Sequence, residues 1–198
     1  MKRVLIIGAG DLGQQIAHYV SESSEHKVIG YVDDWANVGD IRRGYPILGC
    51  VKDIEMLYHK GVFDELLIGI GYKHFDARKQ LFDQYKSIIP FATYLHPSSY
   101  IDSTSRIGSG VIVLPGCVVD CEAVLQDNVF IYSGCVIGHN TQIRAHSIIS
   151  LSVTTGGFSE IGESCFLGIK TCICDNIVIA NHTFLGAGAN VIKNILDE

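Results

Sequence analysis

The sequence predicts an α/β domain over residues 1–94 followed by a parallel β-helix over residues 95–198. Two observations support this prediction. The second half repeats every six residues without an insertion, and the first half opens with an apolar run, a glycine-rich turn and an amphipathic segment. With 198 residues, 47% of them hydrophobic, the chain is large enough to form two small cores.

The repeat begins at Ile101 and contains 16 six-residue units, covering 96 residues. Every sixth residue from Ile101 to Val191 is Ile, Leu or Val except Thr155, which gives 15 of 16 leading positions. These three types make up 57 of 198 residues, so chance alone would fill fewer than a third of the leading positions. A run of unrelated short strands therefore does not explain the pattern.

The fifth position of each unit holds only small or β-branched residues, among them Cys117, Cys135 and Cys165. We expect each unit to form one short strand and one corner, with its leading aliphatic residue pointing inward. Equivalent residues then stack about 4.8 Å apart, and three units make one triangular coil. Gly often follows the leading aliphatic residue, where we expect a tight corner to need an unhindered backbone.

The first half begins with the features of a phosphate-binding βα unit. Val4 to Ile7 form an apolar run that predicts a strand, and Gly8-Ala9-Gly10-Asp11-Leu12-Gly13 follows directly. Leu12, Ile16 and Val20 then recur at helical spacing. Glycines at such a turn let the backbone approach an anion, and the helix N-terminus offers free N–H groups.

The remaining elements of this domain follow from shorter patterns. Strands are predicted at Lys27 to Val32 and Leu66 to Ile70, a helix at His74 to Lys86, and a final strand at Phe91 to Leu95. The domain then has about four strands, which is half of a dinucleotide-binding fold.

Two acidic residues, Asp33 and Asp34, lie 20 residues or slightly more beyond Gly13. A G-x-G-x-x-G turn followed by such an acid is typical of NAD sites, where the acid accepts the ribose hydroxyls. The half-size domain and the absence of a hydride-acceptor domain favour a mononucleotide over NAD. A glycine-rich turn that binds no ligand is a further alternative.

Composition narrows the classes of partner. The net charge is −6, from 15 Lys and Arg against 21 Asp and Glu, with no basic cluster, so we expect neither a nucleic-acid partner nor an anionic membrane surface. No apolar stretch approaches the ~20 residues of a membrane span. The seven Cys form no paired C-x-x-C units and no secretory signal precedes them, so we expect a cytoplasmic protein with mostly buried, reduced thiols.

Six short motifs occur in order along nearly the whole chain: Gly8-Ala9-Gly10, Tyr31-Val32-Asp33-Asp34, Ile68-Gly69-Ile70-Gly71, Leu95-His96-Pro97-Ser98, Ile137-Gly138-His139 and Cys165-Phe166-Leu167-Gly168-Ile169. With them the chain resembles the bacterial nucleotide-sugar acetyltransferases, typified by UDP-4-amino-sugar (bacillosamine) N-acetyltransferase and the sialic acid O-acetyltransferase-like proteins. The resemblance implies a Rossmann-like domain that binds a nucleotide-linked amino sugar. It also implies a left-handed β-helix, a homotrimer, and acetyl-CoA in a groove between neighbouring subunits, with no metal.

The resemblance assigns binding roles residue by residue. It implies that the diphosphate and sugar are faced by Gly10, Asp11 and Leu12. It implies that the base and ribose are faced by Asp33 and Asp34, and that Gly71 lies close to the substrate. Three residues match positions that line the acetyl-CoA groove: Gly157, Ile169 and Ala187.

The expected catalytic base is His139, two residues after the leading Ile137 and hence near an outward-facing corner. Acetyl transfer to an amine needs a group that removes a proton, and a neutral imidazole suits this near pH 7. The N–H of Gly157 is a candidate donor to the oxyanion. Many relatives carry an acid directly after this His, whereas here it is Asn140, expected to orient the ring by hydrogen bonding. His146 is expected to be a solvated corner residue.

The sequence therefore predicts an acetyl-CoA-dependent N-acetyltransferase acting on the 4-amino group of a UDP- or dTDP-linked amino-deoxy sugar. An O-acetyltransferase on a related sugar is the near alternative, and a non-catalytic nucleotide-sugar-binding trimer is the alternative outside the enzymes. A β-helix zinc enzyme with three His ligands between subunits is disfavoured, because His139 and His146 have no convincing third partner.

Overall fold

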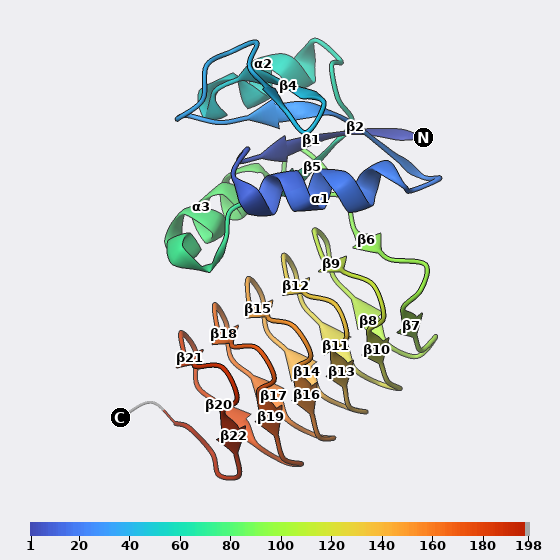
Figure 1. Cartoon of the computed structure of the whole chain (residues 1–198), viewed down its shortest axis with the longest axis vertical. Helices are drawn as coiled ribbons and strands as arrows, with labels where there is room; N and C mark the ends of the chain where they lie inside the picture. The colour runs from blue at the N-terminus through green and yellow to red at the C-terminus, as the bar shows by residue number, and fades with distance from the viewer. Residues whose placement is uncertain (197–198) are drawn as a thin grey trace. The chain divides into compact units, whose positions relative to one another are not determined.

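The computed structural model describes residues 1–196, which form two compact units, residues 1–92 and the residues from Thr93 onward (Figure 1). The first unit contains a five-stranded sheet in the order β3-β4-β2-β1-β5. Its strands are β1 (Lys2–Ile7), β2 (His26–Val32), β3 (Ile41–Arg42), β4 (Tyr45–Gly49) and β5 (Glu65–Ile68). All neighbours are parallel except β3 and β4. Three α-helices accompany the sheet: α1 (Asp11–Ser21), α2 (Ile54–His59) and α3 (Phe75–Tyr85), with 3-10 turns η1 (Val51–Asp53) and η2 (Tyr72–His74).

The central strand and the helix after it form as predicted. Residues Val4 to Ile7 of β1 are fully buried, as expected of a parallel strand covered on both faces. The apolar face of α1 buries Ile16, Ala17 and Val20. The strands predicted at Lys27–Val32 and Leu66–Ile70 and the helix predicted at His74–Lys86 correspond to β2, β5 and α3, within a few residues at each end.

Three glycines allow the first turn to close tightly. Gly8 has a positive φ of 95°, and a Cβ on Gly13 would lie 1.9 Å from the Gly8 carbonyl oxygen. A Cβ on Gly69, just after β5, would lie 2.5 Å from the Gly13 Cα. The start of α1 therefore packs backbone against backbone on the ends of β1 and β5, which is the role expected of the last glycine in G-x-G-x-x-G.

One predicted strand was wrong. Phe91–Leu95 does not form a single strand of the α/β domain. Phe91 makes an isolated bridge with Leu66, whereas Tyr94 and Leu95 form β6, which pairs with β9 of the second unit. The boundary between the units, at Ala92 and Thr93, divides this apolar run.

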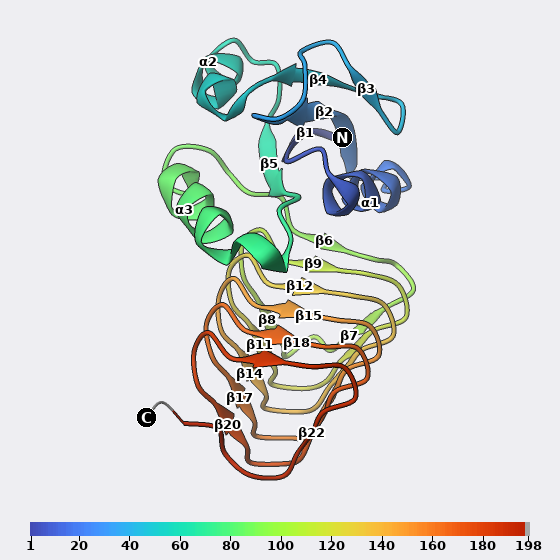
Figure 2. The same cartoon turned by 60° about the vertical axis from the view of Figure 1, so that its left-hand side comes forward.

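The second unit is a parallel β-helix of two-residue strands in three sheets (Figure 2). The first sheet contains β7 (Tyr100–Ile101), β10 (Val118–Val119), β13 (Val136–Ile137), β16 (Thr154–Thr155), β19 (Cys172–Ile173) and β22 (Asn190–Val191). The second contains β8 (Arg106–Ile107), β11 (Val124–Leu125), β14 (Gln142–Ile143), β17 (Glu160–Ile161) and β20 (Val178–Ile179). The third contains β6 (Tyr94–Leu95), β9 (Ile112–Val113), β12 (Phe130–Ile131), β15 (Ile148–Ile149), β18 (Phe166–Leu167) and β21 (Phe184–Leu185).

The hexapeptide prediction is confirmed position by position. Each predicted leading residue from Ile101 to Val191 is the second residue of a strand from β7 to β22. Paired residues are 18 apart, such as Ile137 and Thr155, so three units make one coil. Most leading residues and the apolar fifth-position residues, such as Cys117, Val129 and Cys165, form one continuous buried core.

The glycines that follow the leading aliphatic residue have a different role from the one expected. The left-handed backbone falls on the fourth residue of the unit, at every sixth position from Gly110 to Gly188. Gly108, Gly138, Gly162 and Gly168 instead permit close stacking of coils, whereas a Cβ on Gly186 would meet no atom of the described residues within 4 Å. A Cβ on Gly138 would lie 2.7 Å from the Thr155 carbonyl oxygen, and one on Gly162 would lie 2.5 Å from the Asn181 nitrogen.

The cysteine prediction was only partly correct. Cys117, Cys135 and Cys165 are buried in the β-helix core as expected of small fifth-position residues. The other four are not buried: Cys50 is half-buried and Cys121, Cys172 and Cys174 are exposed. None of the seven cysteines, all within residues 1–196, forms a disulfide. Within residues 1–196, no helix has both the length and the apolar character needed to cross a bilayer.

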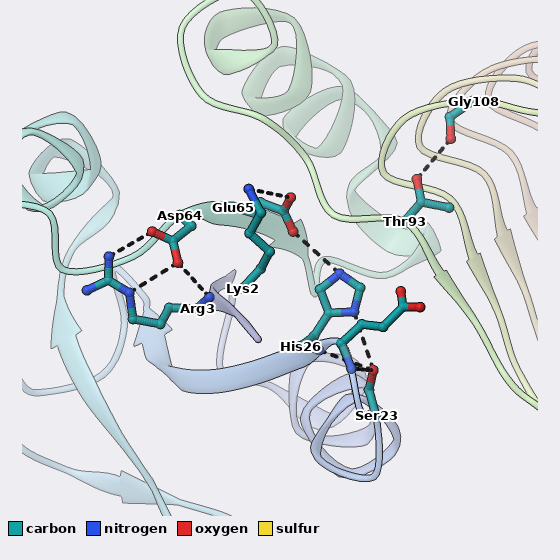
Figure 3. A network of polar contacts seen from close by, with 9 residues as sticks. Lys2, Arg3, Ser23, His26, Asp64, Glu65, Thr93 and Gly108 are labelled. Atoms are coloured by element: carbon teal, nitrogen blue, oxygen red, sulfur yellow. Dashed lines mark hydrogen bonds and ion pairs between the residues drawn. The ribbon is translucent and has the colours of Figure 1, made fainter.

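Ion pairs join the strands of the first unit where β1, β2 and β5 begin (Figure 3). Arg3 pairs with Asp64 at 2.7 Å, and this guanidinium lowers the pKa of the Asp64 carboxyl to about 2. His26 is buried, with its Nε2 3.4 Å from the Glu65 carboxylate. This end of the sheet is opposite to the glycine-rich turn, because parallel strands share one direction.

Candidate active site

The first part of the candidate site lies where β1, β2 and β5 end. Gly8 donates its N–H to the Val32 carbonyl at 2.8 Å, and Gly69 donates to the Ile7 carbonyl at 2.7 Å. The residues that follow these three strands are thereby held at one edge of the sheet, the edge at which ligands bind in open α/β folds.

The two aspartates predicted to face the base and ribose organise this edge. Asp33 accepts the Ala9 N–H on Oδ2 and the Trp35 N–H on Oδ1, both at 2.7 Å. Asp34 accepts the Val51 N–H on Oδ1 at 2.8 Å. A carboxylate offers about four acceptor sites, so each aspartate can still accept a hydrogen bond from a ligand hydroxyl.

The residues predicted to face the diphosphate and sugar gather at the N-terminus of α1. Gly10 is the residue before the helix, and a Cβ there would meet no atom within 4 Å, so the space over it is open. Asp11 is exposed and Leu12 half-buried. A Cβ on Gly71 would lie 3.9 Å from Leu12 Cδ2, which brings the turn after β5 beside the start of α1.

A polar hollow of about 330 Å³ adjoins this helix. It is lined by Asp11, Gln14, Gln15, His18, Tyr19 and Arg43. Arg43 was not anticipated from the sequence. It sits with Gly44 in the turn between β3 and β4, with φ of 47° and 83°, the positive values that a two-residue hairpin requires. The adjacent Arg43 and Gly44 are the sequence feature that could have indicated this hairpin turn.

The second part of the site is the corner after β13, where His139 is exposed. Its Nδ1 is 3.1 Å from Asn140 Oδ1. An amide oxygen only accepts, so Nδ1 donates this bond, and in the neutral ring Nε2 is then the acceptor nitrogen. Asn140 itself has a φ of 57° and donates its N–H to the Cys121 carbonyl at 2.9 Å. Within residues 1–196 no group forms a hydrogen bond with Nε2 of His139.

Residues of the next coil fix the imidazole plane. The Phe158 ring meets the His139 ring edge-to-face, with centroids 4.9 Å apart and planes at 90°. The imidazole lies over Gly157, where a Cβ would be only 2.6 Å from both Cε1 and Nε2. Gly157 is therefore required to be glycine by the position of the His139 ring.

The expected role of the Gly157 N–H as an oxyanion donor is contradicted. That N–H donates to Asp175 Oδ1 at 2.8 Å, so it is already occupied. Asp175 and Phe158 were both missed in the sequence. The coil length could have identified Asp175 from the sequence. His139, Gly157 and Asp175 are spaced 18 residues apart and therefore share one corner.

The three residues predicted to line the acetyl-CoA groove do not meet within one chain. Gly157 follows β16, whereas Ile169 follows β18 and Ala187 follows β21, at a different corner. Ile169 and Ala187 are one coil apart on that corner and are both exposed. A groove lined by all three therefore requires two copies of the chain.

The expectation for His146 was wrong. This residue is 4% exposed, and its Nδ1 lies 3.0 Å from Asn128 Nδ2 one coil earlier. Its side chain lies against the equivalent residue of the preceding coil instead of in solvent. Within the described residues 1–196, no three His, Cys, Asp or Glu side chains gather as a metal site would require.

The fold and these two sites define a class of protein: a hexapeptide-repeat β-helix that carries an N-terminal nucleotide-binding-type α/β domain. Residues 89–196, more than half of the chain, match the sequence family described as the GMPPB C-terminal domain, and residues 3–85 match the PglD N-terminal domain. The chain therefore belongs, through residues 89–196, to the family of the GMPPB C-terminal domain.

Curated relatives match this chain over part of their length. UDP-3-O-acylglucosamine N-acyltransferase of Janthinobacterium sp. is 30% identical over 90 residues, 46% of this chain and 25% of the relative. The Bordetella pertussis protein of the same description is 28% identical over 94 residues, 46% of this chain and 26% of that protein. The chain thus spans about a quarter of the length of these relatives.

Solved structures match the whole fold. A histidine-to-asparagine variant of perosamine N-acetyltransferase from Caulobacter crescentus, in complex with CoA and GDP-perosamine, superposes with a TM-score of 0.90 and 24% identity, covering 100% of this chain and 92% of the other. The acetyltransferase domain of PglB from Neisseria gonorrhoeae, in complex with acetyl coenzyme A, has a TM-score of 0.90 and 22% identity, covering 99% and 93%. These likenesses confirm the fold.

Proposed function

We propose that this chain is an acetyl-CoA-dependent N-acetyltransferase that acts on the 4-amino group of a nucleotide-linked amino-deoxy sugar in bacterial surface glycan synthesis. The observation that carries the proposal is the state of His139. Its ring lies over Gly157 and edge-to-face with Phe158, its Nδ1–H is bonded to Asn140, and the residue is exposed with Nε2 as the acceptor nitrogen of the neutral ring. This is the arrangement a general base requires.

The chemistry follows from that geometry. The sugar amine attacks the thioester carbonyl of acetyl-CoA while Nε2 of His139 takes the proton that the nitrogen loses. A C–N bond forms, the C–S bond breaks, and the CoA thiolate recovers the proton from the imidazolium. Asn140 keeps the ring in the tautomer with the free Nε2 but adds no charge. A positioned base of this kind contributes about 10²–10⁴-fold to the rate.

A homotrimer is part of the proposal. Gly157 lies on the His139 corner, whereas Ile169 and Ala187 lie on another corner of the same chain. A groove for acetyl-CoA that uses all three residues needs the corner of a neighbouring copy. Because Asp175 occupies the Gly157 N–H, we assign the oxyanion donor to a group other than Gly157.

The nucleotide is assigned to the edge formed by the ends of β1, β2 and β5. Gly10, Asp11, Leu12 and Gly71 would receive the diphosphate and sugar, because open space lies over Gly10 at the N-terminus of an 11-residue helix. UDP and dTDP are the carriers expected from the sequence. The Caulobacter crescentus relative was crystallised with GDP-perosamine, so guanine belongs among the bases to be tested.

The test is a thiol-release assay with acetyl-CoA against UDP-, dTDP- and GDP-linked 4-amino sugars and their 4-hydroxy counterparts, with products identified by mass. CoA release together with an acetylated amino sugar supports the proposal. Release with hydroxy sugars alone assigns O-acetylation, since the same His139 can deprotonate a hydroxyl. Binding of nucleotide sugars without any release assigns a non-catalytic trimer. No binding of these sugars, with NAD raising the melting temperature, overturns the nucleotide-sugar assignment.

A further inference from the structure

The most exposed large side chain at the candidate nucleotide site is Trp35, which is 98% exposed. It is the sole tryptophan of the chain. It comes three residues after the end of β2, whose last residues, Tyr31 and Val32, are fully buried. An indole presents a large apolar surface, so leaving it wholly in water is unfavourable unless something else covers it.

The backbone around Trp35 is anchored although its side chain is not covered. One carboxylate, that of Asp33, receives the N–H groups of both Ala9 and Trp35 at 2.7 Å. Trp35 is therefore tied to the glycine-rich turn through a single side chain. Asp34, the residue before Trp35, is also anchored, because it accepts the Val51 N–H at 2.8 Å. The indole projects from a fixed base beside the turn.

The sheet order determines which part of a nucleotide Trp35 can meet. β1 lies between β2 and β5, so a diphosphate at the turn after β1 has the end of β2 on one side and the end of β5 on the other. Gly71, assigned to the sugar, follows β5. The nucleoside would then lie at the end of β2, where Asp33, Asp34 and Trp35 are found.

We propose that Trp35 is the stacking surface for the base of the nucleotide-linked sugar. This inference rests on the proposed function and extends it by naming the residue that supplies base affinity. Every base has a π-face, so stacking on indole gives affinity to uracil, thymine and guanine alike, while hydrogen bonds elsewhere choose among them. Trp35 lies at the nucleoside end of the site and takes no part in proton transfer at His139.

Tryptophan fluorescence tests the proposal, because the chain offers one reporter. UDP, dTDP and GDP are titrated into the full-length protein, with affinity measured independently by calorimetry. We expect saturable quenching with the calorimetric Kd. Trp35→Ala should weaken binding about 5- to 150-fold, and Trp35→Phe should recover most of it. Val38→Ala, an exposed apolar residue of the same loop, should bind as the wild type does.

Turnover gives a second readout. If Trp35 contributes only base binding, Trp35→Ala raises KM for the nucleotide sugar and leaves kcat at saturation within about twofold. Calorimetric binding without quenching, and with full affinity in Trp35→Ala, overturns the stacking assignment while the proposed function stands. If no nucleotide or nucleotide sugar binds the wild type, the proposed function fails and the stacking assignment fails with it.

Discussion

Replacing Gly157 by Ala tests the position of the proposed base without touching it. The new methyl carbon would lie 2.6 Å from Cε1 and Nε2 of His139, about 0.8 Å inside the 3.4 Å at which ordinary contact begins. The backbone of Gly157 cannot yield freely, because Asp175 holds its N–H and the next coil packs below it. The imidazole must therefore swing away by about 1 Å, which costs about 10²-fold in kcat.

Stability should change little, because His139 is exposed and can rotate into solvent. Loss of the edge-to-face contact with Phe158 lowers the free energy of unfolding by at most about 1.5 kcal/mol. The assay is kcat for CoA release, with urea unfolding in parallel. Gly186→Ala is the matched control, since a Cβ there meets nothing within 4 Å. In a His139→Ala background, Gly157→Ala should add no further loss. A Gly157→Ala enzyme with kcat within twofold of the wild type would refute this account of the site.

Three further predictions concern the first unit. Asp64→Asn should lower the urea midpoint at pH 7. Its carboxyl pKa is lowered by Arg3 from 3.8 to about 2, so the stabilisation is present above about pH 4 and disappears as the pH falls toward 2; a wild-type difference that persists at pH 2 would contradict this. Tyr31→Phe should raise the free energy of unfolding by about 1 kcal/mol at pH 7, because its hydroxyl is buried and has no hydrogen-bond partner within residues 1–196. Burial raises the pKa of Tyr31 from 10 to about 12, so the wild type, unlike the Phe variant, should lose stability from this group as the pH rises from 10 through 12. Gly13→Ala should destabilise the unit by about 3 kcal/mol or more, since its Cβ would overlap the Gly8 carbonyl oxygen; near-wild-type melting would show that the turn can open.

The β-helix could be predicted because its rule is local. Six residues form one strand and one corner, so the apolar residue recurs wherever the chain points inward, from Ile101 to Val191. The first strand of the β-helix, β6, was missed because residues Phe91 to Leu95 are mostly apolar. Nothing in this run indicates where the chain passes from the core of the first unit to that of the β-helix. β3 and β4 were missed because the first has two residues and the second contains Pro46 and Gly49, which interrupt the alternation of a strand.

The types of residue in the candidate site were predictable, but their partners were not. The sequence indicated that Asp33 follows a strand, yet only the fold shows its carboxylate bridging the Ala9 and Trp35 amides. Gly157 was singled out for its N–H, but in the structure that N–H donates to Asp175. The absence of a side chain on Gly157 is what makes room for the His139 ring. Both contacts span coils or strands, and such pairings depend on the length of a coil, 18 residues, more than on any local pattern.

The burial of His146 has the same origin. A corner position suggested solvent, but the His146 side chain is buried against Asn128, 18 residues earlier. Polar residues of a β-helix corner can therefore be assessed only together with their equivalents on adjacent coils.

The most direct test of the central claim is the rate of acetyl transfer by His139→Ala. The assay measures single-turnover CoA release with the nucleotide-linked amino sugar that the wild type accepts, at saturating acetyl-CoA. His182→Asn is the control, an exposed histidine with a φ of 58° that asparagine tolerates. The account predicts a loss of about 10²–10⁴-fold for His139→Ala, with nucleotide-sugar affinity retained and the control unchanged. A His139→Ala enzyme that transfers acetyl groups at the wild-type rate would contradict it.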